Sequence, residues 1–556
     1  MMRKIKHLFA CLLAVSLLGG MAMLPAQAAQ AFSTTPMIVA KGANIVLKAD
    51  GTVWGWGSNI LGQLGDGTTI TRNKPVQAKN IDHVIAVDEG DDHTVALKDD
   101  GTVWSWGQND QGQLGDGKGG FIDGGARSNF STVPVKAVGL DHVIAIAAGP
   151  QDTIALKDNG TVWVWGDNYD GQLGNGTGAV FDGTPNNILT PTQVPGFNDV
   201  VSVTGCSQTF LVKKDGTLWA SGYGVWFIPG ATPDKDGLDY DARTTFEQIP
   251  NLSDVHVTSV AAATETTLML TSDKTIWTMG ENFDGQRGTP INFLIPIWAM
   301  SPGFANISPY PTQTEDLTDV TAVAAGERHS LALTGDGTVW AFGFDEEGQL
   351  GDGRYVTDFN IDWNTYRRYT PMPVHNLSNV TAIAASADHN AALKSDGTIW
   401  TWGSNAGDAL GIGTEGVDDP LRATPVQVLS PNGKGYFNAY ESTIPATSVT
   451  IAGGVAHNLD VGQTLQLAAT VAPGNATYQD VTWSTSNAAV ATVTTDGLVK
   501  AVGSGTATIT ATTVDGSYTA TVSVTCVKTI FSTKYVSNFL NWLLFIVCFG
   551  WIWMWF

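Results

Sequence analysis

The feature that most constrains this chain is a short motif that recurs seven times. Its fullest form is ALKDDGTVWSWGQNDQGQLGDG, residues 96–117. The tryptophan that closes each D-G-T-[VIL]-W motif, or its variant, recurs at intervals of 50 to 63 residues, at Trp54, Trp104, Trp163, Trp219, Trp277, Trp340 and Trp400. Seven copies with a period in this range predict a repeat architecture in which each copy buries its apolar face against its neighbours.

Each copy has the pattern of four short strands. VIAVDEG (84–90) and HTVALK (93–98) are apolar or β-branched runs, an Asp-Gly turn follows, and TVWSWG alternates apolar with small residues. Asp-Gly between two such runs favours a hairpin, because glycine adopts a positive φ without steric cost. A further short strand contains Pro-Val, as at residues 75–76 and 134–135. Seven such copies without helical periodicity predict an all-β fold with a seven-bladed β-propeller over residues 36–429.

The segment VTAVAAGERHSLALTGDGTVWAFGFDEEGQLGDG, residues 320–353, carries a family resemblance. It is similar to repeats of the regulator-of-chromosome-condensation family, which run A-A-G-x-x-H-[ST]-x-A-L, D-G-x-[VL]-[WY]-x-[WF]-G and G-Q-L-G. The resemblance covers all seven copies and implies a seven-bladed propeller. The family includes a eukaryotic nucleotide-exchange factor for the small GTPase Ran and secreted bacterial propellers, among them an inhibitor of β-lactamases. The resemblance therefore implies a protein-binding role, and we do not carry the exchange activity over to an exported chain.

The N-terminus has the pattern of an export signal. Basic residues at positions 3, 4 and 6 precede an apolar stretch over residues 8–24 and an A-x-A site at residues 26–28. This pattern predicts a signal peptide over residues 1–28 and a secreted or cell-surface bacterial protein. The chain has 29 Lys and Arg against 52 Asp and Glu, a net charge of −23, which makes nucleic acid a poor partner. Its four cysteines are too far apart for a disulfide framework or a metal-ligand motif.

The pattern changes after the repeats. Residues 430–443 are rich in Pro, Gly and Ser and predict a linker, and residues 444–527 form alternating strands typical of a small β-sandwich. VTWSTSNAAVATVTTDGLVKAVGSGTATITA, residues 481–511, resembles the group-2 bacterial immunoglobulin-like domain, which implies a surface-associated spacer or adhesive module. The tail, residues 528–556, ends in 18 largely apolar residues that are just long enough to span a bilayer, but no basic residue follows them. The tail is compatible both with a membrane anchor and with a C-terminal end that has no function.

Candidate binding residues lie where the copies vary most, between G-Q-L-G and the Pro-Val strand. These loops are expected on one propeller face, and in copies four to six they are long and aromatic, at about 224–246, 289–310 and 354–370. Large aromatic side chains beside polar residues are favoured at interfaces. The alternative is that the loops fold back over their own blades. The candidates are Trp226, Phe227, Tyr240, Phe293, Trp298, Tyr310, Tyr355, Trp363 and Tyr366.

Another set of residues is expected to form a ring. Eleven residues before the repeat tryptophans stand Ala43, His93, Asp152, Gln208, Thr266, His329 and His389. Three histidines at one level could hold a metal ion, but we favour the repeat's ordinary histidine, satisfied by local contacts. No recognisable nucleotide loop, calcium loop or catalytic dyad stands out. We therefore expect no enzyme activity, no cofactor and no metal.

These observations favour an extracellular, non-enzymatic scaffold that uses the loop-bearing face of the propeller. The expected partner is an extracellular protein or glycan, and the chain is expected to be a monomer, with the tail as an open route to membrane attachment. The alternative is a secreted inhibitor of an extracellular enzyme. An enzyme built on a propeller scaffold is the least favoured hypothesis.

Overall fold

The computed structural model describes residues 32–120, 129–178, 186–222, 243–264, 266–290, 307–314, 317–355, 363–414, 416, 420–441, 444, 446–474, 476–514 and 518–528. The predicted signal peptide and all of the apolar tail beyond residue 528 lie outside these ranges. Within them, no helix is both long enough and apolar enough to cross a membrane.

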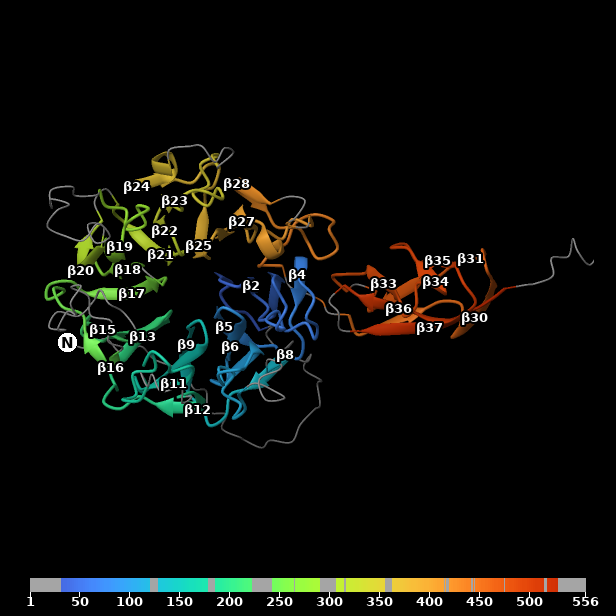
Figure 1. Cartoon of the computed structure of the whole chain (residues 1–556), viewed down its shortest axis with the longest axis horizontal. Coiled ribbons are helices and arrows are strands. Elements are labelled where there is room, and N and C mark those ends of the chain that lie inside the picture. The colour runs from blue at the N-terminus through green and yellow to red at the C-terminus, as the bar shows by residue number, and fades with distance from the viewer. Residues whose placement is uncertain are drawn as a thin grey trace, which may run out of the picture. The chain divides into compact units, whose positions relative to one another are not determined.

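Seven antiparallel sheets of four strands each make up the described residues between Met37 and Gln427 (Figure 1). In every sheet the four strands are consecutive in the chain and lie side by side in that order. The first strands are β1 (Met37–Ala40), β5 (Val84–Glu89), β9 (Val143–Ala148), β13 (Val200–Gly205), β17 (Val257–Ala262), β21 (Val320–Ala325) and β25 (Val380–Ala385). The second strands are β2 (Ala43–Leu47), β6 (His93–Lys98), β10 (Asp152–Lys157), β14 (Gln208–Lys213), β18 (Thr266–Thr271), β22 (His329–Thr334) and β26 (His389–Lys394).

The third and fourth strands complete each sheet toward its outer edge. The third strands are β3 (Val53–Gly57), β7 (Val103–Gln108), β11 (Val162–Gly166), β15 (Leu218–Gly222), β19 (Ile276–Glu281), β23 (Val339–Phe344) and β27 (Ile399–Ser404). The fourth strands are β4 (Arg72–Gln77), β8 (Phe130–Lys136), β12 (Ile188–Gln193), β16 (Arg243–Gln248), β20 (Ile307–Gln313), β24 (Arg367–Pro373) and β28 (Leu421–Gln427). Among the described residues, the short 3-10 helices η2 (Trp363–Tyr366) and η3 (Ala406–Asp408) lie between third and fourth strands.

The sheets are the blades of a closed ring. Each first strand contacts the first strand of the next sheet, and β25 returns to contact β1. Figure 1 shows the first strands toward the middle of the ring and the fourth strands toward its rim. The predicted seven-bladed β-propeller is therefore confirmed.

The alternation of strand direction sorts the connections onto two faces. The tip between the first and second strands lies on the same face as the loop between the third and fourth strands, because two strands separate them. The Asp-Gly turns and the links to the next blade lie on the opposite face. We call these the loop face and the turn face.

The Asp-Gly motif builds the turn face in the way the sequence predicts. Gly101 has a φ of 75°, and Asp100 Oδ1 accepts hydrogen bonds from the amide and hydroxyl of Thr102 at 3.0 and 2.6 Å. The indole N–H of Trp104 donates to Thr102 Oγ1 at 3.1 Å. In the fifth blade Lys274 replaces the glycine with a φ of 63°, a conformation that costs a residue with a Cβ about 1 kcal/mol. The repeat tryptophan thus packs over the turn that precedes it.

The second aromatic residue of W-x-W-G joins neighbouring blades. The indole N–H of Trp106 donates to the backbone oxygen of Gln63 in the preceding blade at 2.8 Å, and Thr94 Oγ1 donates to the same oxygen at 2.8 Å. The glutamine of G-Q-L-G therefore holds the next blade through its carbonyl. The same indole bond joins Trp165 to Gln113 and Trp402 to Gln349.

The ring closes between blades one and seven without exchange of a strand. Trp56 donates its indole N–H to the oxygen of Ala409 at 2.9 Å, as at other junctions. Within the segment predicted as a linker, Phe437 is 1% exposed and packs 5.6 Å from Trp54, measured between ring centroids. The amide of Ala49 donates to the oxygen of Ala439 at 2.8 Å. This segment therefore seals the seam.

The C-terminal part is the predicted small β-sandwich. One sheet has the order β30-β37-β36-β33, and the remaining strands form the pair β29-β32 and the sheet β31-β35-β34. Aliphatic side chains between the sheets, such as Val499, Ile509 and Val524, are fully buried. The strands are β29 (Ser448–Ile451), β30 (Ala456–Asp460), β31 (Thr464–Gln466), β32 (Ala469–Ala472), β33 (Val481–Thr485), β34 (Ala491–Val493), β35 (Leu498–Ala501), β36 (Gly505–Thr513) and β37 (Thr519–Val527).

Candidate functional site

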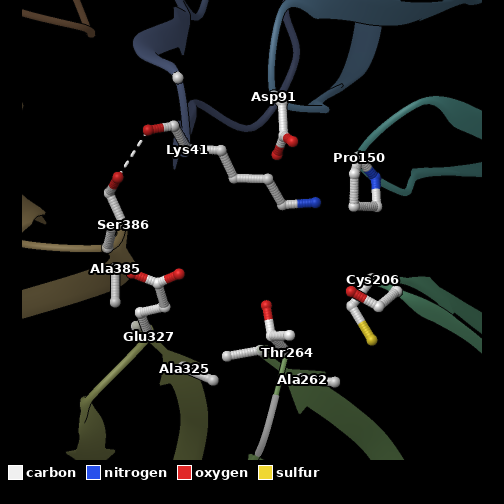
Figure 2. A pocket seen from close by; sticks show the side chains of 15 residues that line it. Lys41, Asp91, Pro150, Cys206, Ala262, Thr264, Ala325, Glu327, Ala385 and Ser386 are labelled. Carbon is white, nitrogen blue, oxygen red and sulfur yellow. Dashed lines mark hydrogen bonds between the residues drawn. The ribbon is translucent and has the colours of Figure 1, made fainter. Parts of the chain in front are cut away.

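A pocket of about 240 Å³ opens on the loop face, where the tips of the first hairpins meet (Figure 2). Each blade contributes the residues that stand between the glycine and the histidine of A-A-G-x-x-H, or their equivalents. We call it the central pocket. The tip residues that line it are Lys41, Asp91, Pro150, Cys206, Thr264, Glu327 and Ala387.

Sequence reasoning missed this site, although a signal for it was present. The two positions between glycine and histidine are occupied by different residues in every copy, with charged, polar and apolar types among them. Local patterns do not show that these positions converge, because they lie about one repeat apart in the chain. Closure of the ring brings them together.

Lys41 reaches across the central pocket. Its Nζ donates to the backbone oxygen of Ala148 at 2.6 Å and to that of Gly205 at 3.4 Å, in blades three and four. Ser386 Oγ donates to the oxygen of Lys41 at 2.5 Å, so a seventh-blade residue holds its backbone. Figure 2 shows the ammonium between Asp91 and Pro150. The side chain therefore ties one side of the pocket to the other.

Blade two carries two acidic residues that bond to its neighbours. Glu89 is fully buried, and its two carboxyl oxygens accept from the amides of Lys41 and Ala43 at 3.1 and 2.8 Å. Burial raises the pKa of Glu89 to about 8, against the lowering effect of these two bonds. Asp88 Oδ2 accepts from the amide of Ala148 at 2.8 Å. The wall beside the pocket is thus built partly from polar side chains of one blade.

The residues eleven positions before each repeat tryptophan form the expected ring. This ring lies buried behind the tips that line the central pocket. Its histidines bond to the next blade: His93 Nε2 lies 3.1 Å from Thr153 Oγ1, and His329 Nε2 lies 2.7 Å from Asn390 Oδ1. Burial lowers the pKa of His93 to about 3, which keeps the imidazole neutral. Among the residues that the structure describes, no group of three or more His, Cys, Asp or Glu side chains is placed to hold a metal ion.

Asp152 occupies the same ring position in blade three and lacks the histidine's bond. It is 1% exposed, and neither carboxyl oxygen has a hydrogen-bond partner within the described part of the chain. The hydroxyl of Thr209, the residue that a histidine would meet in blade four, also has none there. Burial raises the pKa of Asp152 well above its usual value. The shorter side chain leaves both groups at this junction unsatisfied.

The cysteine among the described lining residues is not activated. Cys206 is buried, and burial raises the pKa of its thiol to about 11. Its Sγ lies 3.3 Å from the backbone oxygen of Gln208, to which it donates. A protonated thiol held in this way is a poor nucleophile, because the thiolate is the reactive form.

The structure describes four of the nine aromatic candidates. Tyr310 on β20 and Tyr355 are each 44% exposed, Trp363 begins η2, and Tyr366 ends it half-buried. Tyr355 and Tyr366 line a shallow hollow of about 320 Å³. The remaining five, Trp226, Phe227, Tyr240, Phe293 and Trp298, lie outside the described residues. Their part in binding stays a prediction.

Comparison with protein families and known proteins agrees with this architecture. An RCC1-like domain matches residues 23–293, and regulator of chromosome condensation (RCC1) repeats match residues 320–349 and 336–393. The ultraviolet-B receptor UVR8 of Arabidopsis thaliana is 27% identical over 74% of this chain and 86% of its own length. The human E3 ubiquitin-protein ligase HERC2 is 27% identical over 72% of this chain, which spans only 8% of that relative.

Solved structures share the fold at lower sequence identity. Prp20p from Saccharomyces cerevisiae superimposes with a TM-score of 0.53 and 22% identity, over 71% of this chain and 87% of its own. Yeast RCC1 (Prp20), solved with Kap60, gives a TM-score of 0.54 at 21% identity, over 76% and 91%. A group 2 bacterial Ig-like domain matches residues 445–524. The chain therefore carries an RCC1-like propeller built from RCC1 repeats, followed by a bacterial Ig-like domain of group 2.

Proposed function

We propose that this chain is an exported, non-enzymatic scaffold whose loop face binds an extracellular protein or glycan. The observation that carries the proposal is the division of constant and variable residues between two faces. The Asp-Gly turns and the blade junctions recur in most copies, whereas the tips differ in sequence and the segments after the third strands differ in both sequence and length. A face that varies on a constant scaffold is typical of recognition surfaces.

The relatives support binding as the general role. RCC1-like propellers of this kind are mainly binding or regulatory proteins, and Prp20p is described by its binding to Gsp1p and histones. Export is proposed from the pattern of residues 1–28, and the Ig-like domain fits a spacer role at a surface. The acidic composition favours partners other than nucleic acid.

The test is capture of partners by the full chain from culture medium and washed cells of the native host. A matched variant has residues 224–242, 290–306 and 356–362 replaced by short Gly-Ser linkers, which spares strands β16, β20 and β24 and helix η2. We expect partners identified by mass spectrometry to be recovered by the wild type and lost by the variant. Equal recovery would place the binding site elsewhere than in these loops.

A control variant separates binding from folding. Asp99→Asn with Asp158→Asn changes two exposed residues on the turn face, and we expect it to capture the same partners as the wild type. Both variants should melt as cooperatively as the wild type. If the captured partner is an enzyme, its rate with and without the chain distinguishes an inhibitor from an adhesive scaffold. Detection of the chain only in the cytoplasm would contradict the proposed export.

A further inference from the structure

The central pocket has the size of a site for one side chain. Its volume of about 240 Å³ lies below the range of roughly 300–1,000 Å³ that is typical of small-molecule sites. The wall is made largely of small apolar residues, including Pro150, Ala262, Ala325 and Ala385. Such a wall packs well against an unbranched aliphatic chain.

Two carboxylates stand at opposite sides of this apolar wall. Asp91 comes from blade two and Glu327 from blade six, and Figure 2 shows both directed toward the space between the tips. Both residues are exposed, and neither forms an ion pair within the described part of the chain. The surrounding tips still remove enough solvent from Asp91 to raise its pKa. Two acidic groups above an apolar wall are complementary to a long side chain with a cationic end.

Lys41 offsets part of this negative charge: its ammonium lies beside Asp91 and acts to lower the pKa of that carboxyl, against the larger effect of burial. This lysine is the single cation among the residues that line the pocket, and its Nζ is already bonded to the oxygens of Ala148 and Gly205. Arg328, next to Glu327, is also engaged elsewhere, since its Nε lies 2.7 Å from an oxygen of Asp284. Asp92, which follows Asp91, does not line the pocket, and its Oδ1 accepts from Gln63 Nε2 at 2.8 Å.

A buried carboxyl, that of Asp152, lies behind this part of the ring. Asp152 is 1% exposed, and its carboxyl points toward the tip of its own blade, where a Cβ on Gly149 would overlap Oδ1. That tip carries Pro150, part of the pocket wall. Both oxygens lack a partner among the described residues. Burial raises the pKa of Asp152, the charges of Asp167 and Asp91 add to this effect, and the charge of Lys41 opposes it. A positive charge in the pocket would stabilise the ionised form of Asp152.

We propose that the central pocket receives one lysine or arginine side chain from a protein partner, with its stem against the alanine and proline wall and its charged end between Asp91 and Glu327. This inference rests on the proposed function of the loop face and narrows it, because it specifies a protein partner with a protruding basic residue.

The test uses defined probes, so it does not depend on finding the natural partner. Cyclic Gly-Ser peptides with one central Lys, Arg, Gln or Leu are immobilised, and the full chain is passed over them in biolayer interferometry. We expect the Lys and Arg loops to be bound about tenfold more tightly than the Gln and Leu loops. This preference should shrink as the salt concentration is raised from about 50 to about 500 mM, because salt screens partly exposed charges.

Matched variants assign the preference to the pocket. Asp91→Asn with Glu327→Gln should abolish it, while Asp99→Asn with Asp158→Asn, which removes two charges from the turn face, should keep it. Equal binding of all four loops, or equal loss in both variants, overturns the inference. Loss of the Lys preference on addition of calcium would assign the pocket to a metal ion and also overturns it. If the chain captures partners but shows no preference among the peptides, the proposed function is retained and only the binding of a basic side chain in the central pocket is refuted.

Discussion

At the scale of single residues, the buried position eleven residues before each repeat tryptophan shows how one side chain can join two blades. His389 Nε2 accepts from Asn44 Nδ2 at 3.1 Å across the seam, as His93 and His329 bond to the blades that follow them. Burial lowers the pKa of His389 to about 4, so the bond is made by a neutral ring. The histidines of the motif are therefore structural, and the imidazoles of His93 and His329 fill the space left by the glycine three residues before each of them.

The same position predicts a stabilising substitution. Asp152→His should form the bond to Thr209 that the shorter carboxyl does not make. The imidazole should fit, because Gly149 stands three residues before this position, as Gly90 stands before His93. Because it also removes a buried unsatisfied carboxyl, we expect a gain of about 1–3 kcal/mol in the free energy of unfolding, measured by urea denaturation. Asp152→Asn has the same length as the native residue and serves as control. A histidine variant no more stable than the asparagine variant would falsify this account.

The sequence predicts some residue roles well and others hardly at all. The Asp-Gly turn follows from its own four residues, and the conformation of Gly101 confirms it. The sequence favours a structural role for the histidines, but the partners of His93 and His329 in the next blade are some sixty residues away and leave no local signal. Lys41 and Asp91 are typical variable surface residues in sequence. Only their meeting at the ring axis gives them a common site.

At the scale of elements, the junction between blades depends on one backbone carbonyl more than on side-chain identity. The oxygen of Gln63 accepts two donors from the next blade, Trp106 and Thr94. Blade six keeps the hydroxyl bond through Ser330, which donates to the oxygen of Gln286 at 2.7 Å, although Phe342 stands in place of the tryptophan. One donor is thus enough to form a junction.

Trp106→Phe tests the contribution of the second donor. The ring fits, since Phe342 is fully buried at the same position in blade six, but the indole bond to Gln63 is lost. We expect a cost of about 1–2 kcal/mol, measured as a lower urea midpoint. Trp104→Phe is the matched control: it loses a bond to Thr102 that is only partly buried, so its cost should be smaller. Equal losses in the two variants would contradict a special role for the junction.

The fifth copy shows where element prediction reaches its limit. Its sequence has lost the glycine of the turn and the leucine of G-Q-L-G, yet β18 and β19 pair in the same register as in other blades. Arg287 is buried in the leucine's place, and burial lowers its pKa to about 10. Local propensity does not explain this blade. Its neighbours on both sides impose the conformation, because every blade must bury two faces.

At the scale of the whole molecule, the period and the turn chemistry were enough to predict the propeller and the β-sandwich. The way the ring closes was not predictable, because residues 430–443 have the composition of a linker. Phe437 within them packs against Trp54 of blade one, and the amide of Phe437 donates to the oxygen of Val428 in the seam at 3.0 Å. A single aromatic residue in a polar segment gives no periodic pattern that would reveal it.

Phe437→Ala tests the seal. Removal of a buried aromatic side chain leaves a cavity between blades one and seven, and we expect a loss of about 3–5 kcal/mol in the free energy of unfolding. In this variant, the backbone amides at the seam should exchange their hydrogens faster than those at the other junctions, as measured by hydrogen-exchange mass spectrometry. Tyr436→Ala is the control, since that side chain is 58% exposed and should leave both measurements unchanged. A uniform rise in exchange around the ring would argue against a seal at this seam.

Each blade consists of four consecutive strands, and this has a consequence for inheritance. Recombination between the turn-face links of two copies inserts, deletes or replaces a complete sheet, whereas in a ring closed by strand exchange the same event would cut through a blade. The tip, the loop, the glutamine carbonyl and the indole of one copy are encoded together. In such a gene, the recognition surface can change one blade at a time. Each exchanged blade carries the backbone and side-chain groups that bond it to its neighbours.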